Sequence, residues 1–159
     1  MSSNSVVFEK AKNYAFLLLK FRLRSENELI ERLKRKNFSE ELSREVVNFL
    51  KEKKFIDDNL FARSWINSRL KRPFGLRRIR SELRAKGVEK EVVEEEISSI
   101  SDNYAEADIV ADLIKQKLNK LKGIEPIVAK RRIYGYLIRR GFSPEVVINI
   151  LNRLCKQTS

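Results

Sequence analysis

Arginine and lysine side chains gather in two short segments whose spacing suits contact with a polyanion. The cations concerned are Arg69, Arg72, Arg77, Arg78, Arg80, Arg84, Lys130, Arg131, Arg132, Arg139 and Arg140. From residue 63 to residue 86, nine cations accompany a single acid, Glu82. Guanidinium and ammonium groups neutralise phosphates, and such contacts hold a protein on nucleic acid whatever the base sequence. We therefore predict that these residues bind either DNA phosphates or an acidic protein surface, two alternatives that the sequence does not separate.

The overall composition agrees with a polyanionic partner and not with an enzyme. The chain of 159 residues has 34 Lys and Arg against 22 Asp and Glu, a formal net charge of +12. It has no histidine and one cysteine, Cys155, which excludes His-based catalysis, His–metal sites and an intrachain disulfide. There is no glycine-rich phosphate loop and no nucleophile in a recognisable setting. We predict a non-enzyme with no catalytic residue, no cofactor and no metal.

The chain is expected to reside in the cytoplasm without a membrane partner. Its longest apolar stretch near the start, residues 14–21, contains Lys20 and is far shorter than the roughly 20 residues of a membrane span. The first ten residues lack the pattern of a secretion signal. A single cysteine fits a reducing compartment.

Helices are predicted nearly throughout, because apolar residues recur at intervals of three and four. Six apolar positions occur three times, first after a shift of 50 residues and then of 54. They are Leu29, Leu33, Phe38, Leu42, Val47 and Leu50; Ile79, Leu83, Val88, Val92, Ile97 and Ile100; and Ile133, Leu137, Phe142, Val146, Leu151 and Leu154. The pattern predicts an all-α fold, an elongated, curved array of three tandem three-helix repeats over residues 1–55, 56–103 and 104–159.

Turn residues recur at the same spacing. Asn37, Gly87 and Gly141 each follow a cation and precede an apolar residue. Asn and Gly best tolerate the left-handed conformation that ends a helix in a Schellman motif, so we expect that motif after each second helix. Helix N-caps are expected at Ser25 (with Glu28 in a capping box), Ser39, Asp57–Asp58 and Ser143.

The third helix of the middle repeat is expected to be acidic and solvated. It carries five glutamates, Glu89, Glu91, Glu94, Glu95 and Glu96. A helix-turn-helix protein would place this helix in the major groove, where phosphates would repel it. The cationic second helices are therefore the predicted contact surface. Among the aromatic residues, Trp65 is expected to be a packing anchor, and Tyr134 and Tyr136 are candidates for stacking on a base or a partner.

Several of these residues together resemble the RecX family of regulatory proteins. The middle repeat carries the resemblance at Asp57–Asp58, Phe61–Ala62, Arg69, Gly75, Ile79, Leu83 and Lys86–Gly87, and the first repeat at Ser25–Glu26 and Glu28–Leu29. The resemblance covers about residues 11 to 154. One departure is Asn37, where the family often has Gly.

The resemblance implies a small cytoplasmic modulator, usually an inhibitor, of the RecA recombinase, in DNA repair, recombination and the SOS response. Family members consist of three tandem three-helix repeats and bind along the deep groove of the RecA filament on DNA. For this chain, the implied partners are the RecA filament and the single-stranded DNA within it, bound by a monomer. Two alternatives stay open: a stand-alone DNA- or RNA-binding helical repeat protein without a recombinase target, and a helical scaffold whose charge serves solubility.

Overall fold

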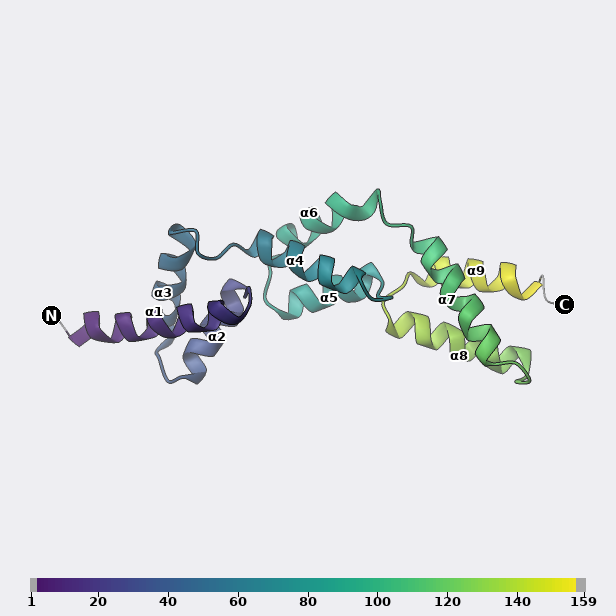
Figure 1. Ribbon diagram of the computed structural model, residues 1–159, viewed down its shortest axis with the longest axis horizontal. Coiled ribbons are helices and arrows are strands. Elements are labelled where there is room, and N and C mark those ends of the chain that lie inside the picture. Colours follow the sequence, from purple (N-terminus) through teal and green to yellow (C-terminus); the bar gives the residue numbers. More distant parts are fainter. Residues whose placement is uncertain (1–2, 157–159) are drawn as a thin grey trace. The chain divides into compact units, whose positions relative to one another are not determined.

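Helices make up the regular secondary structure of residues 3–156, the part of the chain that the computed structural model describes (Figure 1). Within this range there is no strand, and the nine helices are α1 (Ser3–Phe21), α2 (Glu26–Arg35), α3 (Glu40–Glu52), α4 (Asp58–Leu70), α5 (Leu76–Ala85), α6 (Lys90–Ser101), α7 (Glu106–Lys120), α8 (Pro126–Arg139) and α9 (Pro144–Lys156). The predicted all-α fold of tandem three-helix repeats is confirmed. The elongation and curvature of the array and the repeat boundaries stay predictions.

Burial follows the threefold apolar pattern. In each repeat, four of the six predicted positions are buried and two are half-buried. The second helix of each repeat supplies two residues that are at most 1% exposed: Leu29 and Leu33, Ile79 and Leu83, and Ile133 and Leu137. Each second helix therefore packs through one apolar side, and its other side remains at the surface.

All three predicted C-cap turns have the hydrogen bonds of a Schellman motif. The φ angles of Asn37, Gly87 and Gly141 are 69°, 75° and 89°. After α8, the Gly141 N–H donates to the Ile138 carbonyl at 2.9 Å and the Phe142 N–H donates to the Leu137 carbonyl at 3.2 Å, and the other two turns repeat this pair.

A fourth turn of the same kind ends α3. Lys54 has a φ of 60°, and the Phe55 N–H donates to the Leu50 carbonyl at 2.9 Å. Nothing in the sequence marks this turn, because a lysine rarely adopts the left-handed conformation.

Side chains cap the first two of the predicted N-termini. The Ser25 hydroxyl accepts from the Glu28 N–H at 3.1 Å, and the Glu28 carboxylate accepts from the Ser25 N–H at 3.3 Å, which completes the capping box of α2. Ser39 caps α3 by accepting from the Leu42 N–H at 3.2 Å. At α9, the Ser143 carbonyl accepts from the Val147 N–H at 3.0 Å, and the Ser143 hydroxyl donates to the Glu145 carboxylate at 3.4 Å.

The two aspartates predicted to cap α4 cap two different helices. Asp57 accepts from the Asn59 N–H at 2.8 Å at the start of α4. Asp58 instead accepts from the Glu26 N–H at 2.9 Å, so it caps the beginning of α2. Sequence spacing could not show this second cap, because its two residues lie far apart in the chain.

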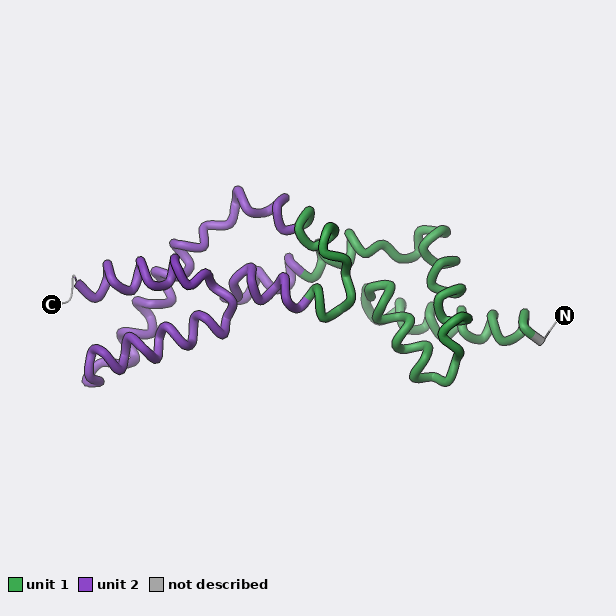
Figure 2. Tube along the Cα trace, turned by 180° about the vertical axis from the view of Figure 1, so that it is seen from behind, with its two compact units in different colours: residues 1–65, 83–96 green, residues 66–82, 97–159 purple. Residues whose placement is uncertain are grey.

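The chain divides into two compact units (Figure 2). Unit 1 consists of residues 1–65 and 83–96, and unit 2 of residues 66–82 and 97–159, so the middle repeat contributes to both. The core of unit 1 includes Leu29, Leu33, Val46 and Leu50, and that of unit 2 includes Ile114, Ile133, Leu137 and Phe142. Over residues 3–156, no helix combines the length and the hydrophobicity needed to cross a bilayer.

Candidate polyanion-binding surface

Helix α5 places its cations away from its buried residues. Ile79 and Leu83 are completely buried, whereas Arg77 and Ser81 are exposed. The first turn of α5 has no acid and carries Arg77 and Arg78, although the positive end of the helix dipole disfavours cations there. The helix dipole therefore does not explain the exposed Arg77, and a residue that breaks a local rule in this way is typical of a functional surface.

Glu82 holds two of the predicted contact residues. It accepts from Arg69 Nε at 2.6 Å and from Arg78 Nε at 3.0 Å. The guanidinium carbons of Arg78, Arg140 and Arg69 lie 4.2, 5.0 and 5.8 Å from the ring centroid of Phe74, which is 8% exposed. These distances are within the range of cation–π attraction. All three arginines therefore contribute to the packing of unit 2 around this ring.

Helix α5 begins directly on the turn between α8 and α9. The Gly75 N–H donates to the Arg140 carbonyl at 2.8 Å, and the Arg77 N–H donates to the Gly141 carbonyl at 3.2 Å. A Cβ atom on Gly75 would overlap the Gly141 carbonyl, and one on Gly141 would overlap Arg78. Two backbones can approach this closely only where neither has a side chain. The approach brings cations of the second and third repeats together in unit 2.

A groove of about 520 Å³ lies at this junction. Its lining residues are Arg77, Arg78, Ser81, Glu82, Ile138, Arg139 and Gly141. With three arginines and one acid, the groove has a positive potential. Planar guanidinium groups fit phosphate and carboxylate oxygens in a bidentate geometry, so either group could occupy it.

The exposed side of α8 extends this surface. Arg131, Arg132 and Arg139 are exposed, opposite the buried Ile133 and Leu137. Arg139 belongs both to this side and to the groove. We call the joined surface the basic track and define it by Arg77, Arg78, Arg131, Arg132 and Arg139.

The remaining predicted contact residues do not line this groove. Lys130 donates to the Asn152 Oδ1 at 2.5 Å, between α8 and α9. Arg72 is exposed in the loop between α4 and α5, and Arg80 is half-buried on α5. Arg84 is exposed and belongs to unit 1.

Of the aromatic residues singled out in the sequence, Tyr136 and Trp65 have cationic neighbours, and Tyr134 is half-buried on α8. Lys117 Nζ and the Arg140 guanidinium lie 4.0 and 5.0 Å from the Tyr136 ring centroid. Trp65 lies 5.8 Å from Phe61, centroid to centroid, and Lys86 Nζ lies 5.2 Å from the Trp65 ring. The Tyr136 and Trp65 rings therefore already contact cations of the protein itself, which favours a packing role over base stacking.

The acidic run of α6 is not solvated throughout, so that prediction was wrong for one residue. Glu96 is 4% exposed and accepts from Arg63 Nε and Nη2, both at 3.0 Å. A buried carboxylate requires such a partner. Helical periodicity did not reveal it, because Arg63 lies on another helix. Glu89, Glu91 and Glu95 are exposed as expected.

Sequence reasoning also missed an ion-pair network on α2 in unit 1. The Glu28 carboxylate accepts from Arg22 Nη2 at 2.8 Å and from Lys86 Nζ at 2.9 Å. Burial alone would raise the pKa of Glu28, but these hydrogen bonds outweigh it and lower the pKa to about 2. The Ser25 hydroxyl donates to the Lys86 carbonyl at 2.6 Å. The hydrogen bonds and ion pairs at the beginning of α2 thus stabilise the fold of unit 1.

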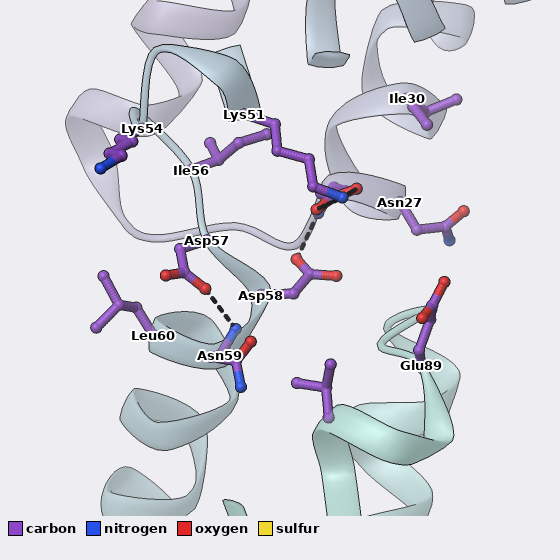
Figure 3. A pocket seen from close by; sticks show the side chains of 13 residues that line it. Asn27, Ile30, Lys51, Lys54, Ile56, Asp57, Asp58, Asn59, Leu60 and Glu89 are labelled. Carbon is purple, nitrogen blue, oxygen red and sulfur yellow. Dashed lines mark hydrogen bonds and ion pairs between the residues drawn. The ribbon is translucent and has the colours of Figure 1, made fainter. Parts of the chain in front are cut away.

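A pocket of about 690 Å³ in unit 1 has the opposite character from the basic track (Figure 3). Figure 3 shows Asp57 and Asp58 at its centre, with the hydrogen bonds from the backbone N–H groups of Asn59 and Glu26. Lys51 Nζ lies 3.0 Å from the Glu26 carboxylate. Burial raises the pKa of Asp58. These acids cap helices and pair with a lysine, which accounts for them within the fold of unit 1.

Fold and charge together define the class of protein: an all-α tandem repeat of three three-helix domains, with cations gathered along one surface of unit 2. Family models of the first, second and third three-helix domains of RecX match residues 11–50, 57–96 and 105–151. Regulatory protein RecX of Caldanaerobacter subterraneus subsp. tengcongensis is 32% identical over 149 residues, which cover 94% of this chain and 73% of that protein. This chain belongs to the RecX family of regulatory proteins.

Two further comparisons agree. Regulatory protein RecX of Mycobacterium sp. (strain JLS) is 34% identical over 148 residues, which cover 90% of this chain and 80% of that protein. The crystal structure of RecX from Lactobacillus salivarius has the same fold, with a TM-score of 0.79 at 22% identity over 92% of this chain and 96% of that one.

Proposed function

We propose that this protein regulates a RecA-type recombinase by binding along the groove of the recombinase filament on DNA, and that its effect is inhibition. The relatives are named as regulatory proteins, which supports the regulatory part of the proposal. The observation that carries the contact surface is the junction in unit 2, where Arg77 of α5 and Arg139 of α8 line one groove. A filament on DNA presents a long series of phosphates, and a row of exposed arginines complements it.

The tandem repeats offer a physical route to inhibition. A chain of several domains can contact more than one recombinase subunit, and each contact after the first is intramolecular. Binding of this kind holds the filament in a state that cannot exchange strands, or blocks the addition of subunits at an end. We propose that the protein acts in this way as a monomer in the cytoplasm, next to single-stranded DNA within the filament.

ATP turnover by the cognate recombinase on single-stranded DNA tests this proposal. We expect turnover to fall as the protein is added, at amounts well below those needed to coat the DNA. An unchanged rate across the whole titration would retire the proposal.

The exposed arginines of α8 favour one second candidate, a nucleic-acid-binding repeat protein without a recombinase target. Such a protein would bind single-stranded DNA or RNA alone, and its affinity would fall steeply with salt. It would affect recombinase turnover only at concentrations that cover the DNA. Measuring both quantities in the same buffer separates the two candidates.

A further inference from the structure

Helix α8 has a glycine in its middle, Gly135, which lies between Arg132 and Arg139 of the basic track in the sequence. Glycine is the least favourable residue for a helix interior after proline. The repeat pattern does not require it, because the equivalent residue is Ser81 in α5 and Glu31 in α2. Gly135 therefore lowers the stability of its own helix, and the repeat architecture does not explain why a glycine is present.

Packing does not require this glycine either. A Cβ atom on Gly135 would meet only the Arg139 guanidinium, with Nη1 at 3.1 Å and Cζ at 4.0 Å, among the residues that the structure describes. The end of an exposed arginine can move aside at little cost. In Gly75 and Gly141, by contrast, a Cβ atom would overlap the backbone of another segment. Gly135 also lacks the positive φ that explains Gly141.

The surroundings of Gly135 indicate what its missing side chain admits. Arg131 and Arg132 lie one turn before it and Arg139 one turn after it, all exposed. From residue 131 to residue 139 the helix extends about 12 Å, at roughly 1.5 Å per residue. Gly135 is half-buried, and the Arg139 guanidinium lies where its side chain would be. When Arg139 turns toward a ligand, the missing side chain lets a chain of phosphates lie low enough for arginines on both sides to reach it.

This geometry favours a phosphodiester chain over the other polyanions. Carboxylates of an acidic protein stand on side chains and can reach arginine tips without a close approach to the helix. Base stacking on Tyr136 is disfavoured, because Lys117 and Arg140 already lie against its ring. A contact through phosphates alone also needs no particular base sequence.

We propose that Gly135 is the point at which the phosphodiester backbone of single-stranded DNA crosses α8, with Arg131, Arg132 and Arg139 on its phosphates. The inference rests on the proposed function only in taking the basic track as a nucleic-acid surface. It goes further in assigning the α8 part of the track to DNA rather than to recombinase protein.

The test uses the whole chain of 159 residues with Gly135→Ala and Gly135→Leu. The probe is a labelled oligothymidylate, whose binding is followed by fluorescence anisotropy. Because alanine favours the helix, we expect Gly135→Ala to raise the Tm by about 2–4 °C. The same variant should weaken DNA binding by about tenfold, the loss that goes with one charge-assisted hydrogen bond, and Gly135→Leu should weaken it more. The matched control is Asn149→Ala on the exposed side of α9, which should leave DNA binding unchanged.

Each other result overturns the inference. Gly135→Ala with a raised Tm and unchanged DNA binding would mean that no phosphate chain lies against the helix. A lowered Tm would mean that packing requires the glycine after all. Weaker inhibition of recombinase turnover with unchanged DNA binding would assign this surface to protein. Failure of the proposed function is a separate observation, since it is recorded as unchanged turnover with the parent protein.

Discussion

Helices α2 and α8 occupy the same place in the first and third repeats, but their surfaces differ. Each buries two residues at equivalent positions, and each ends in a Schellman turn. Helix α2 begins with Glu26 and Glu28, and the Glu28 carboxylate is held by two cations of unit 1. Helix α8 has no acid in its first turn and exposes three arginines. The buried positions and the turn thus specify the repeat. The exposed side is left to differ between copies: it serves folding in α2, and we propose that it serves binding in α8.

The largest expected effect concerns the feature that the two helices share, the turn. Gly141→Ala should lower the free energy of unfolding by about 3 kcal/mol or more, because it adds left-handed strain and an overlap with Arg78. Asn37→Gly, at the equivalent turn after α2, should change it by less than about 1 kcal/mol. Urea denaturation followed by circular dichroism measures both. Equal losses would contradict the view that Gly141 has a packing role that Asn37 lacks.

The second prediction removes the difference in surface charge between α8 and α2. Replacing Arg131, Arg132 and Arg139 together by Ala should lower the affinity for single-stranded DNA by about a hundredfold at low salt and leave the fold intact, because we propose that each arginine contacts a phosphate. The control removes three exposed cations of unit 1, Lys10, Arg35 and Lys53, and should stay within about threefold of the parent. Anisotropy titrations provide both numbers. Similar losses in the two triple variants would show that net charge alone governs binding.

The third prediction concerns the pH dependence of stability that Glu28 gives to the α2 side of the comparison. Since the folded protein lowers the pKa of Glu28 from 4.5 to about 2, its stabilising contribution is present above pH 4.5 and is lost as the pH falls toward 2. Arg22 is 43% exposed, so solvent screening limits the contribution to about 1–2 kcal/mol. Glu28→Gln should remove this contribution at neutral pH and flatten the dependence of stability on pH below 4.5. If the stability of the variant fell below pH 4.5 as steeply as that of the parent, this role of Glu28 would be contradicted.

The smallest expected effect concerns the acid within the basic track region. Glu82→Gln should raise the affinity for single-stranded DNA by about two- to threefold, because it removes the negative charge next to Arg69 and Arg78. It should also cost about 0.5–1 kcal/mol of stability through the weakened hydrogen bonds. Parallel binding and denaturation measurements check the two changes. Weaker DNA binding would mean that Glu82 positions the arginines for their ligand.

The features that the sequence predicts well are local. Helical periodicity located the buried positions, and the Asn or Gly after each second helix located the turns, because both depend on residues within about two helical turns of one another. Lys54 is the exception, since its residue type hides the turn that it makes.

The features that could not be predicted join distant parts of the chain. Composition marks Arg139 and Lys130 equally, yet the fold brings Arg139 to Arg77 in one groove and Lys130 to Asn152. The Arg63–Glu96 pair likewise depends on which helix sides meet. Spacing in one sequence does not contain this information.

The salt dependence of binding to single-stranded DNA tests the central claim most directly. The logarithm of the binding constant falls linearly with the logarithm of the salt concentration, by about 0.7 per phosphate contacted on a single strand. If Arg131, Arg132 and Arg139 each contact a phosphate, the slope for the triple variant should be shallower than that of the parent by about 2. Parallel lines for the two proteins would contradict the claim.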